Sequence, residues 1–263
     1  MLSDVQLDEL RLRGTTRVAE MIDAEAAGAI EDDIWRYLDG RCGAVPDDPS
    51  TWPDEIGKLQ ALRRERVFDA FRNDRLAAIC EQLLGPGWVG DLTHPQALMS
   101  FPGPGPWELP HGVWHFDLPA RGSTQRLGAL RLIGFVNEVE PRGGGTLVVE
   151  GSHTLVERLV AETGGDAGQS KDARRALRSN HPWFATLNER GDPEARIRRL
   201  MDEGDEIDGV AVRVAELTGS PGDAFVMHPW VLHNIAPNRG GRPRMMFTHT
   251  IYAAGSPFLV PRG

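Results

Sequence analysis

The chain has 263 residues, a formal net charge of −9 at pH 7 and two cysteines. An acidic chain lacks the basic face that a phosphate backbone requires, so we expect no nucleic-acid partner. The sequence contains no apolar run long enough to span a membrane, its N-terminus lacks the basic-then-apolar order of a secretion signal, and two cysteines make no disulfide framework. We therefore expect a cytoplasmic protein with no membrane partner. We expect residues 1–263 to form one domain, as a monomer or a homodimer.

The first third of the chain, residues 1–87, is predicted to be a mainly helical support. The predicted elements are a helix over 4–12, a strand over 16–22, a loop over 43–57 and one or two helices over 64–84. Between them, Asp23 is a good N-cap, and apolar residues recur at helical spacing as far as Gly40. We therefore predict a further helix that begins after Asp23 and ends at Gly40.

From residue 88 onward the sequence consists of short apolar runs between Gly and Pro turns. The predicted strands are 88–92, 95–101, 112–118, 128–136, 145–150, 211–217, 223–228, 230–235 and 244–252. Because no helix separates most neighbouring runs, we predict a mainly β fold, a double-stranded β-helix (cupin-type jelly roll) over 88–263 that is flanked by helices. Residues 154–208 have a helical pattern, and an insert of this length predicts a mobile lid over the barrel mouth.

The segment His115-Phe116-Asp117 is the strongest functional signal. In an extended strand, residues two apart project to the same side, so an imidazole and a carboxylate lie next to each other. Two histidines and one carboxylate on one side of a metal form the facial triad of non-haem iron(II) oxygenases, which leaves three positions open. The third ligand has to come from far along the chain, and His228 and His233 compete for this role.

A hairpin argument favours His233 as the third ligand. If 223–235 pairs with 244–252, position 233 lies opposite Arg244, and a guanidinium there can bind the far carboxylate of a dicarboxylate co-substrate through two hydrogen bonds. We therefore predict that His115, Asp117 and His233 bind a metal and that Arg244 lies beside it. His228 and His153 are expected to be structural.

Several motifs in this order support a family resemblance. They are His115-x-Asp117, Gly143-Gly144-Gly145-Thr146, Gly151-Ser152-His153, Gly222-Asp223, His228-Pro229 and the pair His233 and Arg244. Together they resemble the phytanoyl-CoA dioxygenase-like iron(II)/2-oxoglutarate oxygenases. The resemblance implies that His115, Asp117 and His233 hold Fe(II) and that Arg244 binds the C5 carboxylate of 2-oxoglutarate, with O2 as the other co-substrate.

The sequence departs from the family at Ile235, where members often have a serine that contacts the co-substrate. The further co-substrate contacts that we expect are Gln96, Met99 and Thr146. For the substrate pocket we expect Trp114, Trp183 and Arg178, since such pockets are largely apolar with a few polar groups.

The activity implied by the resemblance is hydroxylation of a small molecule, with release of succinate and CO2. One alternative is a cupin-like isomerase or binding module that uses the same three ligands without 2-oxoglutarate. Arg244 discriminates between the two, because a site that never binds a dicarboxylate does not need a buried guanidinium. A structural β-sandwich with incidental histidines is the third interpretation.

Overall fold

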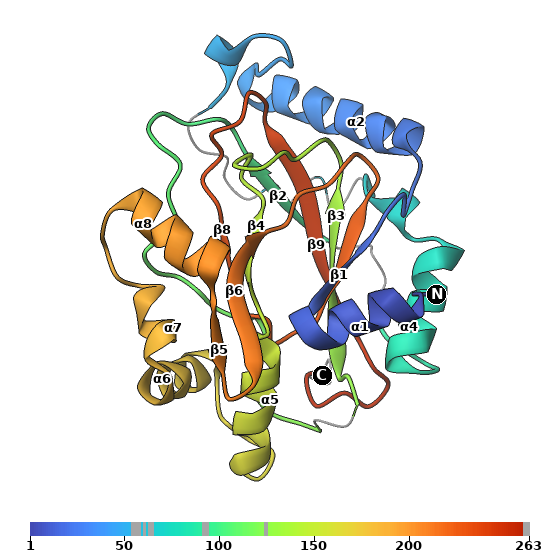
Figure 1. The fold of residues 1–263 in the computed structure, drawn as a ribbon. Coiled ribbons are helices and arrows are strands. Elements are labelled where there is room, and N and C mark those ends of the chain that lie inside the picture. The colour runs from blue at the N-terminus through green and yellow to red at the C-terminus, as the bar shows by residue number, and fades with distance from the viewer. Residues whose placement is uncertain (54–58, 60–61, 63–65, 91–94, 124–125, 260–263) are drawn as a thin grey trace.

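Two antiparallel β-sheets face each other in the computed structural model, and helices cover their outer faces (Figure 1). The structure describes residues 1–53, 59, 62, 66–90, 95–123 and 126–259. The larger sheet has the strand order β1-β7-β3-β9-β2 and the smaller sheet the order β5-β6-β4-β8. The predicted jelly-roll fold is therefore confirmed.

The strands are β1 Thr15–Val18, β2 Gln96–Ser100, β3 Ala129–Phe135, β4 Thr146–Glu150, β5 Asp205–Ile207, β6 Val210–Glu216, β7 Ala224–Met227, β8 His233–Ile235 and β9 Arg244–Tyr252. The helices are α1 Asp4–Arg13, α2 Ala24–Cys42, α4 Asp74–Leu84, α5 Ser152–Glu162, α6 Ser170–Asn180, α7 Pro182–Thr186 and α8 Pro193–Ile197, with the short helices η1 Pro49–Thr51, η2 Asp69–Phe71 and η3 Arg198–Glu203. Among the described residues, no helix combines the length and the apolar character needed to cross a bilayer.

Helix α2 begins where the sequence predicts and ends later. The Asp23 side chain accepts a hydrogen bond from the Ala26 N–H at 2.7 Å, which confirms the N-cap. The predicted end at Gly40 is wrong, because the helix continues to Cys42. It stops where Gly43 adopts a φ of 71° and donates its N–H to the Asp39 carbonyl, a left-handed cap that glycine forms without strain.

Two strand predictions need correction. The segment 112–118 is not a strand, and its one β-bridge joins His115 to His233. Of the predicted strand 88–92, Val89 forms a single bridge with Tyr252, and residues 91–92 lie outside the described part of the chain. The predicted loop 43–57 and helical segment 64–84 also extend partly beyond the described residues.

Successive side chains along each strand point to opposite faces of the sheet, so apolar residues of one strand belong to different clusters. In β9, Met245 and Phe247 pack against the helices of the N-terminal third, whereas Met246 packs between the two sheets with Ile133 and Phe135. Side chains at the even positions of β9 therefore point into the sandwich, and those at the odd positions point outward. This assignment of faces positions the candidate site.

The insert 154–208 covers the outer face of the smaller sheet (Figure 1). Leu155 and Val156 from α5 and Leu177 from α6 are buried in one cluster with Leu147 and Val149 of β4. These helices thus form part of a packed core on this sheet, and the mobility expected of the insert stays a prediction. The insert is a wall of the barrel.

His153 is a buried structural residue, as expected. Its side chain is 3% exposed, and Nε2 lies 3.1 Å from the Arg11 carbonyl, so this interaction ties α5 to the end of α1. Burial and the neighbouring His228 lower the pKa of His153 to about 4, although Glu157 and the carbonyl act in the opposite direction.

This shift predicts a loss of stability in acid. The unfolded chain protonates His153 below its ordinary pKa of 6.5, while the folded chain keeps it neutral down to about 4. The free energy of unfolding should therefore fall by roughly 3 kcal/mol between these pH values through this group. Denaturant unfolding of the parent and of His153→Gln across this range measures the effect. The variant should show the shallower slope, and equal slopes would contradict the assignment.

Candidate metal centre

His115 and His233 lie opposite each other at the edge of the smaller sheet. The His115 N–H donates to the His233 carbonyl at 3.0 Å, and the His233 N–H donates to the His115 carbonyl at 2.8 Å. Asp117 completes the group: Oδ1 lies 3.7 Å from His115 Nε2, and Oδ2 lies 3.4 Å from His233 Nε2. One ligand atom from each residue lies within 4.8 Å of the others, which is close enough for a single metal ion to bridge them.

Backbone carbonyls fix the tautomer of both histidines. His115 Nδ1 lies 2.8 Å from the Val113 carbonyl, and His233 Nδ1 lies 2.9 Å from the Val231 carbonyl. A carbonyl oxygen only accepts, so each Nδ1 carries the proton, and in the neutral ring Nε2 keeps a free lone pair directed at the group. This is the usual arrangement of metal-binding histidines.

The protonation states also suit a metal. Burial raises the pKa of Asp117, whereas contact with His233 and the charge of Arg131 lower it, to a net value of about 2. Burial and the neighbouring His233 lower the pKa of His115. At neutral pH the site therefore offers one carboxylate and a neutral imidazole at His115, which are the forms that bind metals. The donor set fits a divalent transition metal.

Solvent reaches the group from one side. The His115 side chain is 40% exposed and that of Asp117 is 27% exposed, whereas that of His233 is 9% exposed. A metal at this centre would thus be held from the protein side and remain accessible beside His115 and Asp117.

Arg244 lies inside the sandwich at the start of β9. It is 2% exposed, and its Nη1 donates to the Gly144 carbonyl at 2.6 Å. Burial lowers the pKa of Arg244 to about 10, although the charge of Glu216 raises it. Asn137 fixes the backbone on both sides of Arg244, because its side chain donates to the Pro243 carbonyl and accepts from the Met245 N–H.

Several buried donors around Arg244 have no partner in the described structure. They are Arg244 Nε, Ser100 Oγ and Thr248 Oγ1. Ser100 pairs with Arg244 across the β2–β9 ladder, and Thr248 is on the same face of β9. Unpaired buried donors are costly. The Arg244 guanidinium and the Ser100 hydroxyl opposite it are thus donors that an anionic group such as a carboxylate could satisfy, and Thr248 lies further along the same face of β9.

Comparison with known families agrees with this geometry. The sequence matches the model of the family Phytanoyl-CoA dioxygenase (PhyH) over residues 10–246. The chain belongs to this family. A search of curated protein sequences gave no match.

Solved structures share the fold at low sequence identity. The alpha-ketoglutarate-dependent carbocyclase SnoK from nogalamycin biosynthesis is 14% identical, with a TM-score of 0.59 over 96% of this chain and 85% of that chain. The epimerase SnoN from the same biosynthesis is 16% identical, with a TM-score of 0.57 over 95% of this chain and 82% of that chain. HygX from Streptomyces hygroscopicus, solved with nickel and 2-oxoglutarate, is 12% identical, with a TM-score of 0.54 over 96% of this chain and 88% of that chain. At these identities the structures establish the fold alone.

The other predicted co-substrate residues lie on different faces. Thr146 shares a face of β4 with Val148, which packs between the sheets, and Gln96 shares a face of β2 with Leu98 and Ser100. Met99 packs against the helices on the outer side, so its predicted contact with the co-substrate is wrong. The register of β2 places Ser100 opposite Arg244 instead.

The predicted substrate residues are not all brought together. Trp114 and Arg178 line one small crevice of about 10 Å³, next to Arg174. Trp183 is 5% exposed and packs edge-on against Phe184 in the core under the insert. Trp183 is not among the residues that line the crevice of Trp114 and Arg178.

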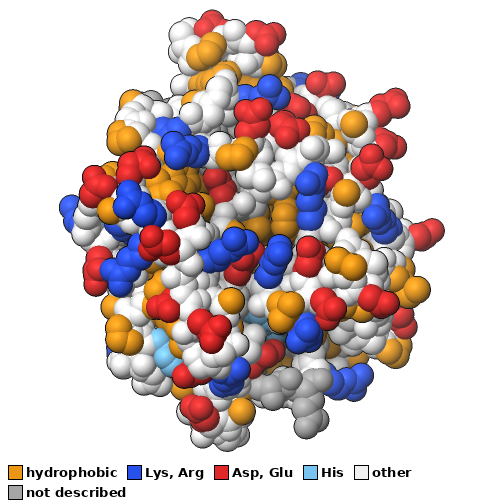
Figure 2. Space-filling model, viewed as in Figure 1, with side chains coloured by type: hydrophobic (Ala, Val, Ile, Leu, Met, Phe, Trp, Pro, Cys, Tyr) orange, Lys and Arg blue, Asp and Glu red, His pale blue; other side chains and the backbone are white. Residues whose placement is uncertain are grey.

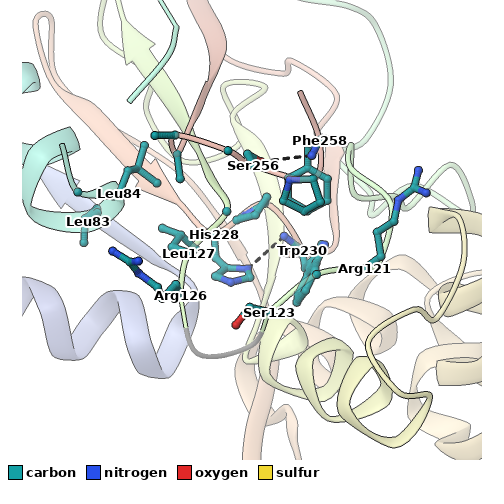
Figure 3. Close-up of a pocket in the computed structure, with 18 of the residues that line it drawn as sticks. Leu83, Leu84, Arg121, Ser123, Arg126, Leu127, His228, Trp230, Ser256 and Phe258 are labelled. Atoms are coloured by element: carbon teal, nitrogen blue, oxygen red, sulfur yellow. Dashed lines mark hydrogen bonds between the residues drawn. The ribbon is translucent and has the colours of Figure 1, made fainter. Parts of the chain in front are cut away.

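A larger cavity of about 710 Å³ opens between the end of α4, the segment around Arg121 and the segment around Phe258 (Figure 3). His228 and Trp230 form part of its wall, and the Trp230 N–H donates to His228 Nδ1 at 3.2 Å. His228 Nε2 lies 3.2 Å from Glu157 Oε1. His115, Asp117, His233 and Arg244 are absent from the described lining. The expected structural role of His228 agrees with these contacts.

The hairpin used to choose between the histidines is wrong. Strand β8 pairs with β4 in the smaller sheet, whereas β9 pairs with β2 and β3 in the larger one. His233 joins the centre because it bridges His115, and a local turn pattern does not reveal that contact. Sequence reasoning also missed Arg131, which lies next to Asp117. The available signal was a single charge within the apolar run Ala129–Phe135.

The arrangement predicts which residues bind a divalent metal. His115→Ala, Asp117→Ala and His233→Ala should each weaken Ni²⁺ binding by at least roughly 100-fold, because a three-residue set has no spare ligand. His228→Ala is the matched control and should stay within about tenfold of the parent. Titration calorimetry of metal-free protein tests both statements. Metal loss in His228→Ala together with retention in His233→Ala would reverse the assignment.

Proposed function

We propose that this protein is an iron(II)- and 2-oxoglutarate-dependent oxygenase that hydroxylates a small molecule, with release of succinate and CO2. The observation that carries the proposal is the pairing of two sites within one sandwich. One is a His-Asp-His group in which backbone carbonyls engage both Nδ1 atoms and both Nε2 atoms face Asp117, and the other is the buried Arg244 with the Ser100 hydroxyl opposite it.

Bound iron(II) and 2-oxoglutarate would together supply the activation of O2 and the oxidation of a substrate C–H bond. His115, Asp117 and His233 would hold the metal from one side and leave the exposed side for the co-substrates. Arg244 would neutralise and orient the far carboxylate, with the Ser100 hydroxyl as a further donor. Apolar side chains between the sheets, including Ile133, Phe135 and Met246, would keep water from the reacting groups.

The solved relatives support this proposal. HygX was solved with nickel and 2-oxoglutarate, and SnoN was solved in complex with Fe3+, alpha ketoglutarate and a nogalamycin compound. Their titles also name an epimerase and a carbocyclase, so one fold carries several oxidative outcomes. We propose hydroxylation because nothing in the described site replaces a metal ligand or adds another reactive group.

The face shown in Figure 2 fits a small-molecule enzyme. Acidic and basic side chains alternate over its described surface, without the continuous basic stripe that a nucleic acid would require. An enzyme that consumes 2-oxoglutarate works where central metabolism supplies it, so we place this protein in the cytoplasm. We propose that it functions there as one domain, in a monomer or a homodimer.

The proposal predicts a selective effect at Arg244. Arg244→Ala should weaken 2-oxoglutarate binding by roughly 100-fold, the equivalent of two charge-assisted hydrogen bonds, and should leave metal affinity nearly unchanged. Arg244→Lys should recover only part of the loss, because an ammonium cannot reproduce the planar fork. Binding of 2-oxoglutarate to protein loaded anaerobically with iron(II) is the measurement.

Arg242 is the matched control, since it is exposed and only two residues away. Arg242→Ala should bind 2-oxoglutarate like the parent. Equal losses at both positions would indicate a general charge effect and reject the assignment. A succinate-release screen in air then tests the activity, and the products of any active substrate should contain an added hydroxyl group.

A further inference from the structure

A second buried guanidinium, that of Arg131, lies beside the metal centre. The Arg131 side chain is 14% exposed. Ile133 and Phe135, two and four residues later in β3, pack between the sheets, so Arg131 also points inward. The interior of an apolar strand is a costly place for a charge, and such a charge requires a partner.

The principal partner of Arg131 is a predicted metal ligand. Nη1 lies 3.1 Å from Asp117 Oδ2 and 2.9 Å from the Thr250 hydroxyl on β9. Arg131 Nε is buried and has no described partner. The two oxygens of Asp117 thus have different surroundings: Oδ2 lies 3.1 Å from Arg131 Nη1 and 3.4 Å from His233 Nε2, whereas Oδ1 lies 3.7 Å from His115 Nε2 and has no described contact with Arg131.

Stability alone is a weak explanation for this ion pair. Burying two charges costs solvation that their attraction hardly recovers, and apolar residues of the same volume often serve equally well. The pair does, however, restrict the carboxylate, which otherwise can rotate and present both oxygens to a metal.

The number of coordination positions left open on a bound metal depends on whether the Asp117 carboxylate can rotate. With six positions, three single-atom ligands leave three open, which is what two donor atoms of 2-oxoglutarate and one O2 require. A carboxylate that bound through both oxygens would occupy a fourth position. The co-substrate could still bind, but no position would remain for O2.

We propose that Arg131 is a positioning residue that holds one oxygen of Asp117 and limits this carboxylate to a single bond with the metal. The inference rests on the proposed function. It assigns Arg131 a role different from that of Arg244: Arg244 serves the affinity for 2-oxoglutarate, whereas Arg131 keeps a coordination position open.

The test counts the water molecules on a bound metal. The full chain is loaded with Mn²⁺, and water-proton relaxation is measured before and after addition of 2-oxoglutarate. The parent should show about three exchangeable waters and then one, and Arg131→Met about two and then none. Metal and 2-oxoglutarate affinities of Arg131→Met should stay within about tenfold of the parent, while turnover at saturating 2-oxoglutarate falls.

Two variants serve as controls. Arg131→Lys supplies one cationic donor and should restore the parent's water count. Thr250→Val removes the other hydrogen-bond partner of Nη1 but leaves the ion pair, and it should also behave like the parent. If Arg131→Met does not fold, Arg131→Gln decides the question, because it removes the charge and keeps a polar side chain.

The same water count in Arg131→Met and the parent would overturn the inference. So would complete loss of Mn²⁺ binding, since Arg131 would then be needed to present the ligand at all. If parent and variant differ by one water but neither binds 2-oxoglutarate, the proposed function fails and the role of Arg131 toward Asp117 stands. The two ideas therefore fail through different measurements.

Discussion

The pair of backbone hydrogen bonds between His115 and His233 is the constraint on which the candidate site depends. It joins two segments far apart in the sequence through a single antiparallel bridge, in which only His233 belongs to a strand. On its other side β8 pairs with β4, where His233 lies opposite Val148, so the position of His233 follows from the smaller sheet. The Asn234 side chain donates to the Gly112 carbonyl and holds the same two segments together.

The backbone around these ligands also sets the orientation of the rings. Val113 has a φ of 61°, a conformation that costs a β-branched residue on the order of 1–3 kcal/mol. Its side chain cannot compensate through packing, since it is 80% exposed. The carbonyl of this strained residue is the acceptor for His115 Nδ1. The strained residue Val113 therefore supplies the carbonyl that engages Nδ1 of His115 and leaves Nε2 as the nitrogen that faces the candidate metal centre.

Sequence patterns predicted the layers of the fold better than its connections. Helix α2 and most strands from β2 onward follow from periodicity, because burial of one face is a local property of the sequence. Strand β5 was missed, because it lies within the insert 154–208 that was predicted to be helical. The segment 112–118 was wrongly predicted as a strand, because Val113 leaves the extended conformation and such strain has no sequence signature. The hairpin was wrong because the chain between β8 and β9 crosses from one sheet to the other, and short turn residues do not specify the sheet to which the next strand belongs.

The candidate ligands could nevertheless be predicted, because His-x-Asp and a distal histidine restrict the choice to a few residues. Their surroundings could not be. The contact between Arg131 and Asp117 joins a strand to a loop, and its only sequence signal is one charge among apolar residues. The register of the β2–β9 pair likewise decides that Ser100, and not Met99, lies opposite Arg244. A shift of one residue in this register would exchange the two faces of the strand.

Arg131 and Arg244 are balanced within the protein by two carboxylates, and a bound metal ion would disturb that balance. The charge of Glu216 acts on Arg244, and its carboxylate also accepts backbone hydrogen bonds from Arg142 and Gly145. Glu216 therefore stabilises the backbone of the segment 142–145 as well as the cation. Asp117, the partner of Arg131, is shared with the histidines and would be shared further with a metal. A divalent ion at that centre would leave the interior with excess positive charge. A dicarboxylate that reaches from the metal to Arg244 would offset this charge at both ends, so the metal and the co-substrate should each favour binding of the other.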